Sequence, residues 1–270
     1  MSTADKFRVA PGADVRLADV ETKDTNGFAD KDAGERTLAQ HSEELAKLQH
    51  RLWAENKRSL LIVLQGMDTS GKDGVIRHVF SCLNPQGLHV VSFKKPSEIE
   101  LDHDFLWRIH AATPTRGDIT LFNRSHYEDV LVVRVHNLVP RSVWEPRYDL
   151  INAFERTLSN EGTTILKFFL HISHDEQRER LQSRLDDPDK NWKFNAQDVE
   201  ERKHWDDYQR AYEDALSRCS TEHAPWFIIP SDRKWAQRAA ISSILLETLE
   251  AMNPRYPRPS IDPASFDLDA

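Results

Sequence analysis

The residues best suited to bind phosphate form a short stretch, Gly66-Met-Asp-Thr-Ser-Gly-Lys72. The stretch fits the pattern G-x-x-x-x-G-K, in which backbone N–H groups curl around phosphate oxygens and the lysine neutralises the outer phosphates. An apolar run precedes it and a helical pattern follows it. An ordinary strand-to-helix turn is the alternative, but such a turn would not need the strand, the glycine loop and the lysine together. We therefore predict a phosphate-binding loop made by Gly66, Met67, Thr69, Ser70, Gly71, Lys72, Asp73 and Gly74.

Two carboxylates distinguish this loop from the usual pattern. Asp73 stands where Ser or Thr commonly offers a hydroxyl to magnesium, and Asp68 lies inside the loop itself. Like charges about 4 Å apart cost on the order of 4 kcal/mol at an effective dielectric of about 20, so Asp68 would repel a bare phosphate. A divalent cation between the two removes the repulsion, which makes Asp68 the first candidate for a magnesium ligand. The alternative is an aspartate that caps its own turn.

A second group of polar residues, Asn123-Arg-Ser-His-Tyr-Glu-Asp129, follows an expected strand at residues 119–122. Open α/β sheets bind ligands beyond the carboxyl ends of their strands, so this arginine and these two carboxylates are in a position to do chemistry. Glu128 and Asp129 are equally compatible with a structural role, as carboxylates favoured by the dipole at a helix N-terminus.

The elements that must position these residues alternate between strands and helices. Short apolar runs predict strands at residues 59–65, 89–93, 119–122, 164–171 and 226–229, separated by segments long enough for crossover helices. This alternation predicts an α/β fold with a doubly wound, mostly parallel sheet between two layers of helices. Apolar spacing also predicts an amphipathic helix over residues 35–56 and a last helix over 235–252.

We divide the chain into three parts. Residues 1–58 form an arm, irregular up to about residue 34, and a helix that packs on the core; residues 59–253 form the phosphate-binding domain, with a helical insertion at about 174–216. Prolines then predict an extended tail over 254–270. Aromatic residues at helical spacing in the insertion, Trp205, Tyr208 and Tyr212, are expected to pack rather than to stack on a base.

Charge and composition exclude several classes of function. The 270 residues carry 36 Lys and Arg against 44 Asp and Glu, a net charge of -8, which disfavours general binding of nucleic acid or of an anionic membrane. The two cysteines form no metal-binding or disulfide pattern. The start of the chain has no apolar signal core, and the longest aliphatic run is too short to span a bilayer. We expect a cytoplasmic protein.

Five ordered motifs give the sequence a resemblance to the family-2 polyphosphate kinases, which move a phosphoryl group between inorganic polyphosphate and nucleotides on a P-loop kinase-like fold with a helical lid. The motifs are Gly66-Met-Asp-Thr-Ser-Gly-Lys-Asp-Gly74, Phe93-Lys-Lys-Pro96, Leu106-Trp-Arg108, Phe122-Asn-Arg-Ser-His-Tyr-Glu-Asp-Val130 and Asp187-Pro-Asp-Lys-Asn-Trp-Lys193.

The resemblance implies roles for individual residues. Lys72 corresponds to the loop lysine, Asp68 to the magnesium carboxylate, Arg124 to the arginine of the second motif and Arg184 to a lid arginine, so these four are the expected catalytic residues. From their spacing, Arg180 and Arg184 would point the same way from one helix and could close over the phosphates. The alternative is that they form ordinary surface ion pairs with the interleaved carboxylates Glu176, Glu179, Asp186 and Asp187. Further expected contacts are Lys94 and Lys95 with polyphosphate, and Asn123, Glu128 and Lys193 with the nucleotide.

One departure concerns the metal and the acceptor. Many family members have Asp where this chain has Asn123, and Asn where it has Glu128, a form that resembles the subgroup accepting both AMP and ADP. Asp68 and Asp129 are the expected metal ligands, with Glu128 or water as alternatives to Asp129.

The resemblance also implies a cofactor and partners. These are Mg²⁺, with Mn²⁺ as an alternative; inorganic polyphosphate; AMP, ADP and ATP, with GMP and GDP as further candidates; and identical subunits in a dimer or tetramer, with neither nucleic acid nor membrane. Two other functions fit the same loop: an ATP-dependent nucleoside or nucleoside monophosphate kinase, and a non-catalytic P-loop module that binds nucleotide.

Overall fold

The computed structural model describes residues 2–25, 27–261 and 266, and it is built on one five-stranded parallel sheet. The strand order is β2-β3-β1-β4-β5, and every neighbouring pair is parallel. The strands are β1 (Ser59–Gln65), β2 (Leu88–Ser92), β3 (Ile119–Asn123), β4 (Thr163–His171) and β5 (Trp226–Pro230). The predicted fold class is therefore confirmed, and each strand lies within a residue or so of its predicted run.

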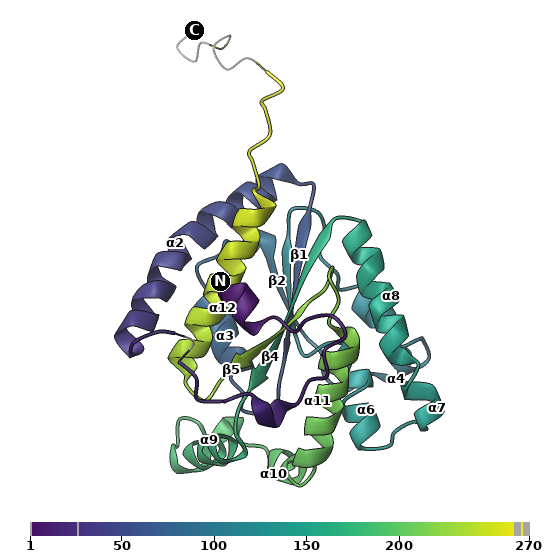
Figure 1. Cartoon of the computed structure of the whole chain (residues 1–270). Coiled ribbons are helices and arrows are strands. Elements are labelled where there is room, and N and C mark those ends of the chain that lie inside the picture. Colours follow the sequence, from purple (N-terminus) through teal and green to yellow (C-terminus); the bar gives the residue numbers. More distant parts are fainter. Residues whose placement is uncertain (1, 26, 262–265, 267–270) are drawn as a thin grey trace.

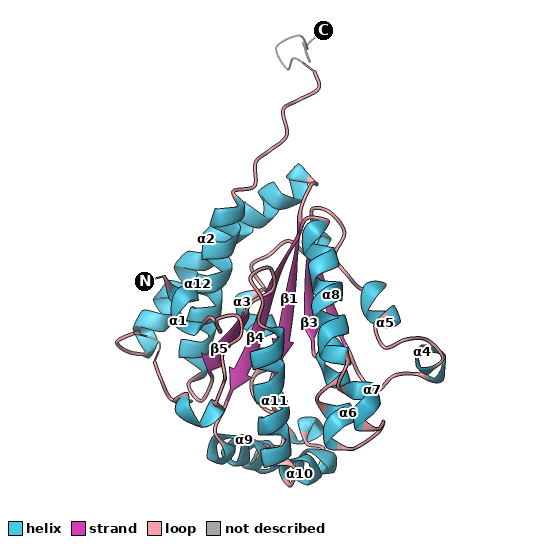
Figure 2. Ribbon diagram, turned by 45° about the vertical axis from the view of Figure 1, so that its right-hand side comes forward, coloured by secondary structure: helices cyan, strands magenta, loops and turns pink. Residues whose placement is uncertain are grey.

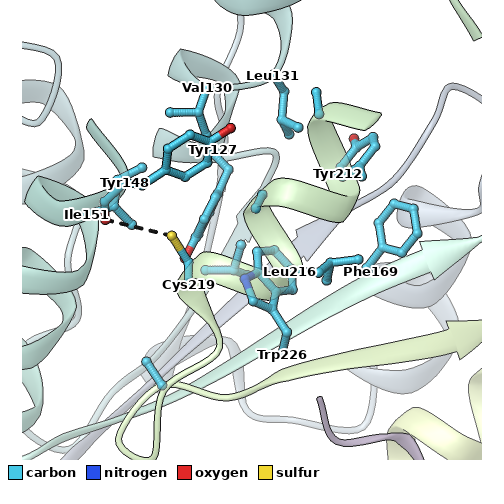
Figure 3. Packing of buried hydrophobic residues seen from close by; sticks show 14 of the residues in the cluster. Tyr127, Val130, Leu131, Tyr148, Ile151, Phe169, Tyr212, Leu216, Cys219 and Trp226 are labelled. Atoms are coloured by element: carbon cyan, nitrogen blue, oxygen red, sulfur yellow. Dashed lines mark hydrogen bonds between the residues drawn. The ribbon is translucent and has the colours of Figure 1, made fainter. Parts of the chain in front are cut away.

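Helices cover both faces of the sheet (Figure 1). On β1, Leu60, Ile62 and Leu64 belong to one buried cluster and Leu61 and Val63 to the other, because successive side chains of a strand point to opposite faces. The first cluster is closed by α2 (Lys31–Glu55), α3 (Lys72–Val79) and α12 (Lys234–Met252), and the second by α8 (Arg147–Asn160) and α11 (Trp205–Cys219). Part of the second cluster is drawn in Figure 3.

Shorter elements connect these layers. The helices are α1 (Thr3–Phe7), α4 (Glu98–Leu101), α5 (Trp107–His110), α6 (Val132–Val135), α7 (Arg141–Trp144), α9 (His174–Asp186) and α10 (Ala196–Arg202). The 3₁₀ turns are η1 (Leu17–Asp19), η2 (Pro85–Gly87), η3 (His126–Asp129) and η4 (Asn191–Lys193).

The N-terminal arm is more ordered than its composition predicts. It begins with α1, whose N-terminus has a reciprocal capping box between Ser2 and Asp5. The amide of Val9 then donates to the carbonyl of Trp226 on the edge strand β5, and Leu17 is buried near the end of β4. A few buried apolar side chains thus hold an otherwise polar arm against the sheet.

The segment predicted as a helical insertion divides into two unlike parts. Helix α11 is a core helix, because Tyr208, Tyr212 and Leu216 are buried against the sheet, and these two tyrosines are packing residues as predicted. In contrast α9, η4 and α10 lie beyond the carboxyl ends of the strands, at the bottom of Figures 1 and 2.

At the other end of the chain, residues 254–259 have no regular structure, consistent with the prolines there. The part of the predicted tail at 262–265 and 267–270 lies outside the described residues. Within the described ranges, no helix combines the length and the apolar character needed to cross a bilayer.

Candidate active site

A cavity of about 590 Å³ lies beyond the carboxyl ends of the strands, where the arrowheads of Figure 2 point toward α9 and α10. The connections that leave the neighbouring strands β1 and β4 run in opposite directions across the sheet, and ligands bind at such a switch point. The cavity is lined by Asp68, Thr69, Ser70, Gly71, Lys72, Asp73, Gly74, Asn123, Arg124, Glu176, Glu179, Arg180, Ser183, Arg184, Lys190, Lys193, Lys234, Gln237 and Arg238.

The loop after β1 has the backbone of a phosphate cradle. Gly66 and Gly71 both have positive φ, and a Cβ on Gly66 would lie 2.8 Å from the carbonyl oxygen of Leu170. Thr69, which is not glycine, also has φ of 66°. The hydroxyl oxygens of Thr69 and Ser70 are buried with no hydrogen-bond partner among the described residues. Buried polar atoms rarely lack partners, so the loop is preorganised for a polar ligand.

Lys72 points back into this loop. Its Nζ donates to the carbonyl oxygens of Gly66 at 2.7 Å and Met67 at 3.2 Å. Burial first, and then the nearby Arg124 guanidinium, lower the pKa of Lys72 to about 8, although the neighbouring carboxylates oppose the shift. A buried ammonium held only by carbonyl oxygens would gain strongly from an anion, which agrees with its predicted role.

Arg124, at the end of β3, bridges the two motifs. Its guanidinium donates to Asp68 at 2.5 Å and to Glu128 at 3.5 Å, and these carboxylates, Glu128 foremost, raise its pKa. Its φ of 63° is unusual for a residue with a side chain, and such strain is concentrated at functional sites. Next to it, the side-chain amide of Asn123 donates from Nδ2 to the carboxylate of Asp73 at 3.0 Å. The structure thus brings the predicted catalytic arginine, lysine and aspartate together.

Glu128 faces a second, smaller cavity on the other side of Arg124. Gly66, Met67, Tyr208 and Tyr212 also line it, so this end of the site is acidic and aromatic. The hydroxyl of Tyr208 donates to Glu201 at 2.7 Å, which fixes the ring at the cavity wall. The predicted nucleotide residues are therefore divided, because Asn123 and Lys193 line the larger cavity and Glu128 lines the smaller one.

Arg180 and Arg184 both line the cavity, but they are held differently. The guanidinium of Arg180 donates to the carbonyl oxygens of Thr69 at 2.8 Å and Ser231 at 2.6 Å. Arg180 is buried, so it fastens the phosphate loop to the segment after β5 and is not free to close over phosphates as predicted. Arg184 instead pairs with Asp198 at 3.0 Å and is half-buried at the cavity wall.

Three predicted site residues are not brought to either cavity. Lys94 and Lys95 are exposed, and the carbonyl of Lys94 is engaged by Arg108, because the chain turns outward after β2 at the edge of the sheet. Asp129 pairs with Arg147 at 3.0 Å. Burial raises the pKa of Asp129 to about 6, although Arg147 and Arg108 oppose the shift.

Three residues that sequence reasoning missed, all on α12, come from the segment after β5. Gln237 donates to the carbonyl of Ser70 at 3.0 Å and so supports the phosphate loop, while Lys234 and Arg238 add positive charge to the cavity. The rule that ligands bind beyond the carboxyl ends of strands, applied to the predicted strand at 226–229, could have found them. On α9, Gln177 similarly donates to the carbonyl of Asp68 at 3.0 Å.

A buried polar network lies beneath the second motif. Lys167 on β4 and Glu155 on α8 are both 0% exposed, with Lys167 Nζ 2.5 Å from Glu155 Oε2. Glu155 Oε1 also accepts from Tyr127 at 2.9 Å and from His126 Nε2 at 3.2 Å. Burial lowers the pKa of His126, so its ring is neutral and the proton on Nε2 donates to the carboxylate. The network anchors the turn η3 that carries Glu128; Figure 3 shows Tyr127 beside Trp226 and Cys219.

The carboxylates at the phosphate loop suit a magnesium ion that also binds phosphate. No group of three or more His, Cys, Asp or Glu that could hold a metal occurs in the described part of the chain. Mg²⁺ is commonly bound by only one or two carboxylates, with phosphates and waters completing its shell. Asp68 and Asp73, both at the phosphate loop, supply such carboxylates.

Comparisons with known proteins agree with this geometry. Residues 28–257 match the family described as Polyphosphate kinase 2 (PPK2). The chain is 53% identical to the AMP/ADP-polyphosphate phosphotransferase of Meiothermus ruber, over 94% of this chain and 96% of the relative. It is 47% identical to the ADP-polyphosphate phosphotransferase of Rhodopseudomonas palustris, over 93% of this chain and 91% of the relative. The crystal structure of Polyphosphate Kinase 2 from Arthrobacter aurescens TC1 superimposes with a TM-score of 0.95, at 43% identity, covering 98% of this chain and 95% of that one.

Proposed function

The chain belongs to the polyphosphate kinase 2 family, and from this membership together with its site we propose how it transfers a phosphoryl group from inorganic polyphosphate to AMP and ADP. The observation that carries the mechanism is the convergence of Lys72, Arg124 and Asp68 at a phosphate loop whose buried hydroxyls have no partner in the part of the chain that the structure describes. Phosphoryl transfer asks a protein mainly for positioning and charge neutralisation, and this arrangement offers both.

In the proposed reaction the loop amides and Lys72 hold the reacting end of the polyphosphate. The terminal bridging P–O bond breaks as the acceptor phosphate oxygen forms a new P–O bond in line, and the shortened polyphosphate leaves. Arg124, held between Asp68 and Glu128, stabilises the charge on the transferring group. Arg184 contributes from the wall formed by α9. No covalent bond to the protein is required.

We propose Mg²⁺ as the cofactor, with Mn²⁺ as an alternative, and Asp68 as its main protein ligand. When bound, the metal neutralises phosphate charge beside the carboxylate. The pairing of Asp129 with Arg147 favours a structural role for Asp129, so Asp73 is the better second carboxylate.

The surroundings of Glu128, rather than the volume of the small cavity beside it, support acceptance of AMP as well as ADP. Glu128 contacts Arg124 there and is accompanied by tyrosines rather than by more cations. We propose that a nucleotide with only one phosphate reaches the reacting position at this end, with Glu128 orienting it through Arg124. GMP and GDP remain candidate acceptors by the same geometry.

An ATP-dependent nucleoside monophosphate kinase would use a similar loop and sheet. The cationic lining of the larger cavity favours a polyanionic donor instead: eight Lys or Arg side chains line it against four Asp or Glu. A non-catalytic nucleotide-binding module would not need Arg124 in a strained backbone conformation next to Asp68. We further propose a cytoplasmic enzyme made of identical subunits, in keeping with two unpaired cysteines and a nucleotide substrate.

The site assignment is tested by substitution. Lys72→Ala and Arg124→Ala should each lower ADP formation from AMP and polyphosphate by a factor of about 10³ or more, with circular dichroism unchanged. Lys57→Ala, which removes a cation from the opposite end of β1, is the matched control. Turnover like that of the wild type in either site variant would remove that residue from the mechanism.

A further inference from the structure

The larger cavity extends past the phosphate loop to the first two turns of α12. Lys234 and Arg238 line this extension, spaced i,i+4 and therefore on the same face of the helix. A Cβ on Gly74, at the start of α3, would lie 3.5 Å from a terminal guanidinium nitrogen of Arg238. The guanidinium therefore lies directly beside the helix that continues the phosphate loop.

Like Lys72 and Lys193, but unlike the three other arginines around the cavity, these two cations form no ion pair with a carboxylate in the described ranges. Arg124 pairs with Asp68, Arg180 with Glu176, and Arg184 with Asp198. Neither Lys234 nor Arg238 forms an ion pair with a carboxylate in the described ranges, and the buried Nε of Arg238 has no hydrogen-bond acceptor there. A cation left without a partner next to a phosphate site is positioned for an anionic ligand.

The electrostatic environment points the same way. Burial lowers the pKa of Lys234, and neighbouring cations, Arg180 before Arg238, lower it further although Glu176 opposes them. Burial likewise lowers the pKa of Arg238, with Arg180 and Arg77 adding to the shift and Glu35 opposing it. Cations that repel one another here would be relieved by a ligand carrying several negative charges.

We propose that the donor polyphosphate leaves the phosphate loop toward α12, and that Lys234 and Arg238 bind phosphate residues beyond the reacting end. This inference rests on the proposed function and assigns a second part of the donor site. It makes the two residues determinants of chain-length preference, because only a donor that extends past the loop can reach them. Lys234 and Arg238 thus take the polyphosphate-binding role that the sequence predicts for Lys94 and Lys95, which lie away from the cavity.

The test compares two donors, long-chain polyphosphate and tripolyphosphate, with ADP as acceptor. In Lys234→Gln/Arg238→Gln, we expect the KM for long-chain polyphosphate to rise about tenfold, as for the loss of one or two charge-assisted contacts, with kcat nearly unchanged. The KM for tripolyphosphate and for ADP should stay within about twofold. Salt should also raise the KM for the long chain less steeply in the variant than in the wild type.

Two controls separate binding from a general effect on structure or charge. Arg178→Gln removes an exposed cation from α9 that does not line the cavity, and it should leave every KM unchanged. Arg238→Lys keeps the positive charge, so its affinity for long-chain polyphosphate should be higher than that of Lys234→Gln/Arg238→Gln.

Equal losses with both donors, or no loss with the long chain, would overturn the inference while leaving the proposed function intact. Failure of the wild type to use either donor would instead refute the proposed function.

Discussion

The buried pair of Lys167 and Glu155 offers the sharpest test of how the fold supports the second motif. Lys167 Nζ contacts Glu155 Oε2 at 2.5 Å, the hydroxyl of Tyr127 at 2.8 Å and the carbonyl of Cys219 at 2.7 Å, and neither charged side chain is exposed. Glu155→Gln leaves the ammonium uncompensated. The new amide must also place its NH₂ toward either Lys167 or the donors of Tyr127 and His126, so at least one hydrogen bond is lost.

The expected cost follows from this geometry. Breaking a buried ion pair by removing one partner destabilises a protein by about 3–5 kcal/mol, a large part of the roughly 5–15 kcal/mol that keeps most proteins folded. Urea denaturation followed by circular dichroism should show a loss of this size for Glu155→Gln. Glu161→Gln, an exposed neutralisation just beyond the end of α8, should change the stability by less than about 0.5 kcal/mol.

A double variant, Glu155→Leu/Lys167→Met, shows whether charge or volume is responsible. Replacing both partners by apolar side chains is often nearly neutral, so the double variant should be more stable than Glu155→Gln. Because η3 loses its anchor in the single variant, kcat should fall further than the fraction of unfolded protein explains. If Glu155→Gln were as stable as the Glu161→Gln control, the reasoning about the buried pair would be refuted.

Three further predictions concern the site. The folded-state pKa of Lys72 is about 8, below the unfolded value of about 10.4, so in the ligand-free protein Lys72 loses its proton as the pH rises through 8. Calorimetry without nucleotide should therefore show weaker polyphosphate binding above pH 8. An affinity for polyphosphate that stays constant across this pH range would contradict the role of Lys72. Glu128→Asn should reduce kcat/KM for AMP at least about tenfold more than for ADP, whereas equal losses would remove Glu128 from acceptor recognition. Chelation by EDTA should abolish transfer and added Mg²⁺ should restore it, and activity that persists in EDTA would exclude the proposed role of Asp68.

The fold was predictable because local patterns agree with it. The run at residues 60–64 is apolar throughout and forms the middle of the central strand β1, which is buried on both faces. The phosphate loop and Arg124 each follow a predicted parallel strand, so their location at the same edge of the sheet could be inferred from the alternation of strands and helices, although the adjacency of β1 and β3 could not.

Other features depend on tertiary contacts that no local pattern encodes. Arg180 has the spacing of a lid arginine, yet the acceptors that bind it belong to the phosphate loop and to the segment after β5, far apart in sequence. Likewise Lys94, Lys95, Lys234 and Arg238 all look like solvated charges in the sequence, and only the sheet order separates the edge strand β2 from the cavity. Lys167 has no sequence signal at all, since its partners come from α8, η3 and the end of α11.

The most direct test of the account is a time course with purified protein, Mg²⁺, polyphosphate and AMP, without added ATP, followed by chromatography of the nucleotides. The account predicts that ADP appears first and ATP follows, since both acceptors use the same site. Formation of ATP from added ADP but no product from AMP would contradict the role given to Glu128. No product from either nucleotide would contradict the central claim that polyphosphate is the donor.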